Sequence, residues 1–553
     1  MTDKRILITI LLVTFLVIIL MFPLRNEVYE DDFVFAYSIE QFLNNHKLVI
    51  SQFSVPLLFP TFWGIIFSII FGYSFKSLNL AIIFFLPFLA IIVFKFLKEA
   101  GNIPIKNSFI LTLFFISIPW IFQYSMMFMS EIPFLTLELF SLFFYFKGIR
   151  ERDNKKLFLG SIFASLAFFT RQLGIVIPIS CTIALITSGK NNSLDSRLKN
   201  ITSAVALPIL SFIAFSWWST IPQNQTIELY NYQNDIKEKF NTLLSYPNSA
   251  NIHEKIELLK LFFHRSIRLF NQIFGIFSPI LILITASNFN RIRKTILKNR
   301  LPLLISLAIF GTIGLDYLIN GQYNLAYPHT LYRYELLFPI PWDHIWKFLV
   351  GLGIILFPQI ISLNFKKVKK VQSENLFLIF SFLGIGILSI TSLWYWNKYI
   401  IPLLPFILIG IGIKTRNFIL FNKYILIVVM FLLFDSIQMT KVRYDQNGIS
   451  QQKGFELIQS GILPGEILPN TNYLWALWFN YDQKIGQELE KVNFNKRLAK
   501  LPKIDEGKKY QYIINSQIDM LRPLPGANYE IIETINLRSL MVKSKVFVIK
   551  KID

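Results

Sequence analysis

Charged residues stand at a few places where a long apolar chain is interrupted. Glu30, Asp31 and Asp32 are adjacent in VYEDDFVFAY, shortly after the first apolar segment. Three neighbouring carboxylates repel one another and stay ionised only if a cation or water lies close by. They are therefore candidates for a general base or for metal ligands. The alternative is a solvated loop or a helix start, which acidic residues stabilise.

Two further charges interrupt later apolar segments. Glu131, in MFMSEIPFLTL, is either an acid of the site or part of a helix start capped by Ser130. Arg171 is the only charge within residues 157–186, which predicts two short helices that turn there. An arginine at membrane depth is costly unless it is paired, and its fork suits a phosphate. Snorkelling to lipid head groups is the alternative.

Two outer segments carry the remaining candidates. His329 and Arg333 stand four residues apart in residues 321–342, a spacing that suits one helical face and the binding of an anion or a metal. Aromatic residues of the membrane interface are the alternative explanation of this loop. Lys398, in LWYWNKYIIPLLPF, is either a membrane anchor or a cation directed at a lipid phosphate.

The elements that must position these residues are membrane helices. Of the 553 residues, 53% are hydrophobic and 56 are Phe, and apolar runs recur from Leu7 to Leu433. A helix needs roughly 20 apolar residues to cross a bilayer, so the composition indicates an all-α polytopic membrane protein and excludes a soluble enzyme. Residues 6–22 lack a cleavage site and are interpreted as a retained helix. Cys181 is the only cysteine, which excludes an intrachain disulfide.

The net charge of +21 marks topology, not nucleic-acid binding, because the basic residues gather between apolar runs. Seven basic segments are expected in the cytoplasm: 1–5, 95–106, 147–156, 189–199, 291–300, 366–370 and 414–423. Their number predicts about thirteen helices in a plasma membrane, a cytoplasmic N-terminus and an outer C-terminal tail. Residues 54–72 are interpreted as an outer interfacial or re-entrant helix, with a true span as the alternative.

Two domains are expected from the change in composition near residue 437. Residues 1–437 form the membrane domain, and residues 438–553 form a small α+β domain outside the cytoplasm. Its β-like runs are 510–516, 529–537 and 545–551, and residues 484–492 have a helical pattern. The chain has no Walker A loop, no GxGxxG, no HExxH and no CxxC, so no nucleotide cofactor is expected.

Four motifs together resemble the GT-C glycosyltransferases, in particular the group of protein O-mannosyltransferases and lipid A aminoarabinose transferases. Residues 31–36, DDFVFA, are similar to the Asp-Glu-x-x-Tyr-Ala pattern of that group, with Phe35 in place of Tyr. SEIPF (130–134) is similar to its second acidic motif, and AFFTRQLGIVIPI (167–179) to its Leu-Thr-Arg-x-x-Gly turn. NKYIIPLLPF (397–406) is similar to its Arg-Tyr-x-x-Pro-x-x-Pro segment, with Lys398 in place of Arg.

The resemblance implies an inverting glycosyltransferase that uses a polyprenyl-phosphate sugar on the outer face of the membrane. Asp31, Asp32 and Glu131 are then the expected catalytic acids, and Glu30 is expected to be dispensable because the pattern begins after it. Arg171, Lys398 and Arg333 are expected to bind the donor phosphate. A divalent metal ion held by Asp32, Glu131 and His329 is a further hypothesis. Membrane lipids and an acceptor of unknown identity are the other expected partners.

Two other functions fit the same composition. A transporter or flippase of lipid-linked sugars would use Arg171 as a charge in its pathway, although no pair of broken helices in related halves supports it. A polysaccharide polymerase or ligase would also transfer sugars at the outer face. A non-catalytic assembly protein is a third alternative, and loss of activity on changing Asp31 would exclude it.

Overall fold

The protein is mostly helical in the computed structural model. The structure describes residues 3–21, 32–46, 48, 56–188, 194–221, 252–290, 293, 301–320, 335–336, 342–362, 372–391, 397–416, 423–462, 467–469, 512–515, 528–538 and 542–552. The N-terminal helices are α1 (Asp3–Met21), α2 (Asp32–Asn45), α3 (Leu58–Phe71), α4 (Phe75–Ile83), α5 (Phe85–Glu99), α6 (Ile105–Ser117), α7 (Pro119–Tyr124), α8 (Glu131–Glu151) and α9 (Asn154–Thr170). The later helices are η1 (Gln172–Ile175), α10 (Val176–Ser188), α11 (Leu194–Thr220), α13 (Ile252–Ser287), α15 (Leu301–Asn320), α16 (Trp342–Ser362), α17 (Ser373–Thr391), η3 (Asn397–Leu403), α18 (Leu404–Thr415) and α19 (Lys423–Gln459).

Eight helices in the described part of the chain are long and apolar enough to cross a membrane. They lie within 3–21, 75–99, 131–151, 195–220, 262–287, 373–390, 398–415 and 425–459. Large apolar side chains on the outside of these helices, such as Leu12, Leu210 and Ile387, are more than half exposed in the protein alone and suit contact with lipid. The expected multi-pass helical protein is confirmed, and the number thirteen stays a prediction.

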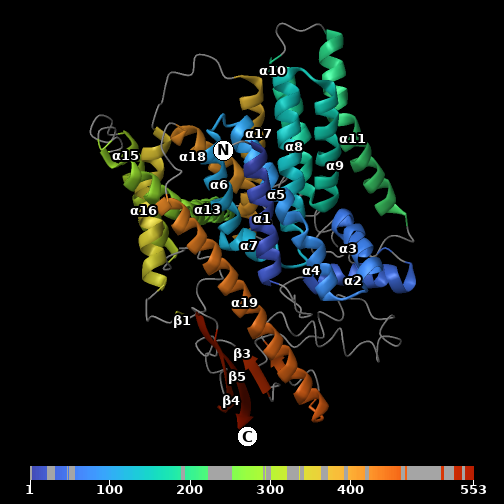
Figure 1. Ribbon diagram of the computed structural model, residues 1–553, viewed down its shortest axis with the longest axis vertical. Helices are drawn as coiled ribbons and strands as arrows, with labels where there is room; N and C mark the ends of the chain where they lie inside the picture. Colours follow the sequence, from blue (N-terminus) through green and yellow to red (C-terminus); the bar gives the residue numbers. More distant parts are fainter. Residues whose placement is uncertain are drawn as a thin grey trace.

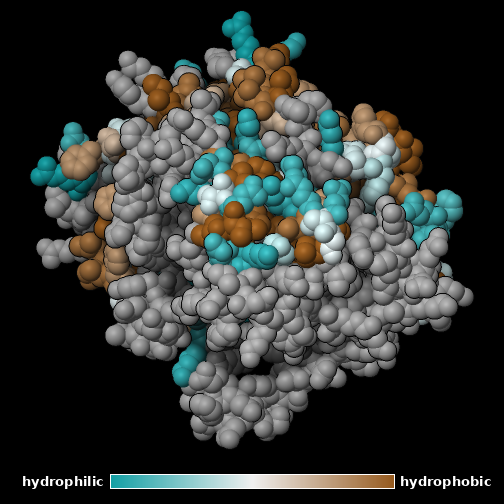
Figure 2. Space-filling model, turned by 90° about the horizontal axis from the view of Figure 1, so that it is seen from below, coloured by the Kyte–Doolittle hydropathy of each residue, from teal (hydrophilic) through white to brown (hydrophobic). Residues whose placement is uncertain are grey.

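The helices have two distinct ends (Figure 1). α8, α9 and α10 stand side by side, and the helix ends that adjoin the basic segments 95–106, 147–156 and 189–199 lie at the top. α2 and α3 lie near the lower end of this group, on the side of the C-terminal strands. Seen from that lower side, hydrophilic and hydrophobic residues are interleaved near the centre of the face (Figure 2).

Close packing of α8 and α9 depends on a glycine. A Cβ atom at Gly160 would lie 2.6 Å from the ring of Tyr145, so only glycine allows this approach. The Ser141 hydroxyl donates to the Gly160 carbonyl at 3.0 Å, and the Tyr145 hydroxyl donates to the Ala204 carbonyl on α11 at 2.6 Å. The three helices therefore form a rigid unit.

The segment interpreted as interfacial forms a short helix. α3 has 14 residues, about 21 Å at 1.5 Å per residue, which is less than the roughly 30 Å of a bilayer core. It packs against α2 and α4, and Trp63 donates to the Ala81 carbonyl at 2.8 Å. These features support the interfacial interpretation, which stays a prediction.

A five-stranded sheet combines four strands after α19 with one short strand between α15 and α16. Its strands are β1 (Glu335–Leu336), β2 (Ile467–Pro469), β3 (Tyr512–Asn515), β4 (Asn528–Arg538) and β5 (Val542–Ile552). β5 pairs antiparallel with β1, β3 and β4, and β2 pairs parallel with β3. The three strands expected in the tail are confirmed, whereas residues 484–492 lie outside the described residues.

The sheet packs on the last helix. Ile449, Leu457 and Ile458 of α19 contact the apolar core of the sheet, and Lys453 forms an ion pair with Glu533 of β4 at 3.1 Å. α19 is continuous from Lys423 to Gln459, so it runs across the expected domain boundary at residues 437 and 438.

Candidate active site

Glu131 begins α8 at the lower end of the helices in Figure 1. Ser130 occupies the N-cap position, but its side chain accepts no capping hydrogen bond, so simple capping does not account for the sequence SEIPF. Pro133 lies in the first turn, where its missing N–H is tolerated. The Glu131 side chain is 1% exposed and belongs to a helix N-terminus that favours a negative charge.

Two cations from distant segments meet this carboxylate. Arg171 Nη1 lies 3.2 Å from Glu131 Oε1, and Lys398 Nζ lies 3.5 Å from the same oxygen. The side chains of Arg171 and Lys398 are only 12% and 14% exposed. Glu131, Arg171 and Lys398, named here the charge cluster, therefore combine one negative with two positive charges.

The turn after α9 positions Arg171. α9 ends at Thr170, Arg171 has extended backbone, and η1 begins at Gln172, as the sequence predicts. A Cβ atom at Gly174 would lie 2.3 Å from the backbone nitrogen of Phe168, so the sharp turn requires glycine. The peptide chain cannot continue as one helix here, and the arginine is placed at the helix end.

Two neighbours hold Arg171 from other sides. Its guanidinium carbon lies 5.5 Å from the ring centre of Tyr399, a cation–π contact from η3. Its backbone forms an isolated antiparallel bridge with Pro56, just before α3. The next residue, Leu57, has φ 46°, a left-handed conformation that costs free energy in a residue with a branched side chain. The short apolar segment is thus tied to the charge cluster.

The charge cluster brings two cations to one carboxylate. Both cations lie near Oε1, and Glu131 Oε2 is buried without a hydrogen bond from the residues that the structure describes. A buried cation is stable only when an anion compensates it. Two nearly buried cations side by side make this place suitable for an anion, and the planar guanidinium of arginine favours a phosphate.

Asp32 lies in a second acidic region on α2. It begins this helix and is fully buried, whereas Glu30 and Asp31 lie outside the described residues. The Tyr73 hydroxyl donates to the Ala36 carbonyl of α2 at 3.2 Å. Partial burial and the nearby carboxylates of Glu40 and Asp32 raise the pKa of Tyr73. Tyr73 is therefore a neutral hydrogen-bonding group beside the acids.

The remaining predicted ligands bear on the metal hypothesis. His329 and Arg333 lie outside the described residues. Within the described ranges, no group of three or more His, Cys, Asp or Glu side chains could hold a metal ion. Glu131 Oε1 already faces two cations, which makes it a poor ligand for a divalent ion. The metal hypothesis therefore depends on residues outside the described ranges.

Three residues near the candidate site escaped the sequence analysis. Tyr73 resembles an ordinary interfacial aromatic, and no signal in the sequence separates it from that class. Tyr399 is the tyrosine of the motif in residues 397–406, and this motif could have identified it. Glu138 lies two turns beyond Glu131 on α8, fully buried, with neither oxygen hydrogen-bonded within the described structure. A carboxylate inside an apolar helix is itself a functional signal, and this rule could have identified it.

A family model matches part of the chain. Residues 54–218 match the model described as dolichyl-phosphate-mannose-protein mannosyltransferase. The matched part runs from the start of α3 into α11 and includes Glu131 and Arg171. The predicted similarity to protein mannosyltransferases is thereby confirmed for this part of the chain. A comparison with curated proteins finds no match.

Three solved structures are distantly similar. ArnT from Cupriavidus metallidurans bound to undecaprenyl phosphate is 11% identical, with 99% of this chain and 98% of that chain covered and a TM-score of 0.39. The same protein in the apo state is 12% identical, with 98% of this chain and 97% of that chain covered and a TM-score of 0.38. The third structure is the archaeal oligosaccharyltransferase AglB from Archaeoglobus fulgidus, in complex with an inhibitory peptide and a dolichol-phosphate. It is 13% identical, with 80% of this chain and 56% of that chain covered and a TM-score of 0.42.

Proposed function

We propose that this membrane protein, whose residues 54–218 carry the mannosyltransferase family signature, transfers a sugar from a polyprenyl-phosphate carrier to an acceptor outside the cytoplasm. The observation that supports the proposal most directly is the charge cluster, in which two nearly buried cations share one carboxylate oxygen. A donor phosphate would bind to these two cations. The family description supports a lipid-linked phosphate as its source.

The proposed reaction displaces a phosphate from the anomeric carbon with inversion. An acceptor oxygen or nitrogen forms a bond to that carbon, and the bond between the carbon and the phosphate oxygen breaks. Asp31 accepts the proton of the acceptor, and polyprenyl phosphate leaves with the electron pair. Arg171 and Lys398 stabilise the negative charge that grows on the leaving phosphate. Asp32, the next residue in the chain, would help to orient Asp31.

The proposed topology has thirteen helices in a plasma membrane. The helix ends next to the basic segments 95–106, 147–156 and 189–199 lie toward one end of the molecule, and the sheet lies at the other (Figure 1). This separation supports a cytoplasmic N-terminus and an outer tail, because basic loops stay inside. Residues 1–437 would then hold the site, and residues 438–553 would form the outer domain.

A transporter or flippase is the second candidate function. The buried Glu138 in the middle of α8 favours it, because carboxylates at such depth occur along transport pathways. A polymerase or ligase differs from the first proposal only in its acceptor. Detection of a new glycosidic product distinguishes all transferases from a transporter.

The experiment is incubation of the purified protein in detergent with a panel of polyprenyl-phosphate sugars. Mass spectrometry would follow the release of polyprenyl phosphate and the mass gained by water, lipid or peptide acceptors. Glycosyl transfer or slow donor hydrolysis with one member of the panel supports the proposal. Intact donors throughout, together with movement of the same lipids across vesicle membranes, would favour the flippase.

A further inference from the structure

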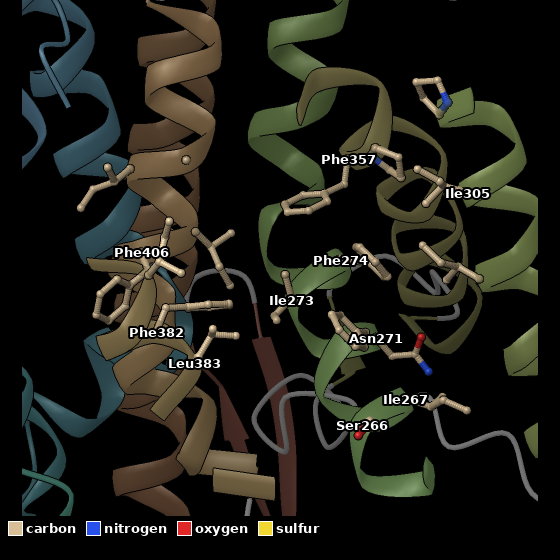
Figure 3. Close-up of a pocket in the computed structure, with 18 of the residues that line it drawn as sticks. Ser266, Ile267, Asn271, Ile273, Phe274, Ile305, Phe357, Phe382, Leu383 and Phe406 are labelled. Carbon is tan, nitrogen blue, oxygen red and sulfur yellow. The ribbon is translucent and has the colours of Figure 1, made fainter. Parts of the chain in front are cut away.

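A large apolar groove lies between the helices of the second half of the chain. Its volume is about 1120 Å³, which exceeds the roughly 300–1,000 Å³ of common ligand pockets. Phe382, Leu383 and Phe406 form one wall, and Ile273, Phe274 and Phe357 face them from α13 and α16 (Figure 3). The contents of this groove must be mostly apolar.

The groove is open to the surroundings of the helices. Leu301, Ile305 and Ile413 line it and are 61%, 43% and 39% exposed in the protein alone. These residues belong to helices with apolar outer surfaces, so the opening lies in the hydrocarbon part of a membrane. Only hydrocarbon chains are abundant there, and water would find few partners among the lining atoms.

The groove and the charge cluster lie on different faces of α17. Phe377 of α17 packs against Tyr145 of α8 with ring centres 5.9 Å apart, and Gly384 lies against Val176 of α10. Leu378 and Phe382, on the opposite face of the same helix, line the groove. A lipid in the groove is therefore separated by α17 from α8, the helix that carries Glu131.

The length and the ends of the groove indicate which lipid fits. Residues 375–383 of α17 and 406–413 of α18 line it over about 10–12 Å, close to half of a roughly 30 Å bilayer core. One leaflet's acyl chain has that reach. The lining residues Leu301 and Ile413 stand next in the chain to basic segments, Leu301 directly after Arg300 and Ile413 directly before Lys414.

We propose that the groove binds one acyl chain of an anionic phospholipid, with its head group at the basic end beside Lys414 and Arg416. Basic residues next to a membrane attract anionic head groups, at about 1 kcal/mol or roughly fivefold in affinity for each charge. The site is distinct from the proposed donor site. It does not depend on the sugar-transfer reaction.

Gly410 offers a direct way to fill the groove. It lines the groove on α18, and a Cβ atom there would have nothing within 4 Å, so Gly410→Leu places a side chain in open space without a clash. Gly351→Leu on α16 is the matched control, because its Cβ is equally free and it does not line the groove. Leucine is the better helix former in both variants.

The first measurement is the lipid that remains on the protein after purification in mild detergent, by native mass spectrometry. Wild type and Gly351→Leu are expected to retain about one anionic phospholipid each, and Gly410→Leu is expected to lose it. A Gly410→Leu protein that retains the lipid like wild type overturns the proposal. A polyprenyl phosphate in place of the phospholipid also overturns it.

The second measurement compares thermal unfolding in nanodiscs of dioleoylphosphatidylglycerol and dioleoylphosphatidylcholine. The anionic lipid should raise the unfolding temperature of wild type and of Gly351→Leu, but not of Gly410→Leu. Changing Lys414 and Arg416 to Gln together should lower the preference for the anionic lipid about 25-fold in a lipid competition. Equal stability of wild type in both lipids would refute the head-group assignment. Neither measurement uses glycosyl transfer, so the result is independent of the proposed function.

Discussion

Replacing Glu131 with Gln removes a buried negative charge while keeping the size of the side chain. Arg171 and Lys398, at 3.2 and 3.5 Å from the same oxygen, would then lose the carboxylate that both of them contact. Removing one partner of a buried ion pair usually costs about 3–5 kcal/mol, because the remaining charge is left in a poor solvent. Glu131→Gln should therefore unfold at a clearly lower temperature than wild type.

The same change should strengthen the binding of a lipid phosphate. Glu131 occupies the two cations in the free protein and competes with an incoming phosphate. One recovered charge-assisted hydrogen bond contributes about 1.5–3 kcal/mol, so a short-chain isoprenyl phosphate should bind about tenfold more tightly or better. Calorimetric titration of the purified variant measures this affinity.

Glu151→Gln is the matched control for this prediction. It lies at the other end of α8, where its ion pairs with Lys147 and Lys156 are exposed and contribute little. Its stability and phosphate affinity should both remain near wild type. If Glu131→Gln behaves like this control in both measurements, the carboxylate does not neutralise the two cations and the reasoning about the charge cluster is wrong.

Four further predictions test the site and the topology. Arg171→Ala should weaken binding of a polyprenyl phosphate by about 1.5–3 kcal/mol, with only partial recovery in Arg171→Lys, and unchanged affinity would assign Arg171 a structural role. Asp31→Asn should lower turnover by about 10² to 10⁴ with nearly unchanged donor binding, and wild-type turnover would exclude Asp31 as the base. Lys76→Cys, expected at the outer face, should react with an impermeant thiol reagent in intact cells, and Lys106→Cys, expected in the cytoplasm, should not, each in a Cys181→Ser background. Equal labelling of the two would contradict their placement on opposite sides of the membrane. Removal of divalent ions with a chelator should lower turnover if a metal assists the phosphate, and undiminished turnover would exclude the metal.

Local features of the fold could be predicted from the sequence. The charge of Arg171 in an apolar run required a turn, and the helices end and begin there. The alternation of apolar residues in the tail gave three strands close to their observed limits. The turn and the strands both depend on residues that are close together in the chain, and a single sequence is enough to identify such local patterns.

The partners of the site could not be predicted in the same way. Glu131 has no basic neighbour in sequence, and its contacts with Arg171 and Lys398 arise from the packing of α8, η1 and η3. The sequence indicated three charged residues at one side of the membrane but not that two share one oxygen. The extension of α19 was missed for another reason. Hydropathy marks the end of a membrane segment near residue 437, whereas the helix continues because Ile449 and Leu457 pack on the sheet.

The unbroken α19 fixes both the distance of the sheet from the membrane helices and its orientation around the helix axis. The Ser436 hydroxyl donates to the Ser117 carbonyl at 2.8 Å, and Lys453 pairs with Glu533, so this helix of 37 residues is held at two points along its length. Each residue added to an α-helix turns the rest of the chain by about 100° and moves it by about 1.5 Å. Two extra residues between these two points would turn the sheet by about 200° and shift it by only about 3 Å. The distance between the sheet and the charge cluster thus changes little when residues are inserted into α19, whereas the orientation of the sheet around the helix axis changes greatly.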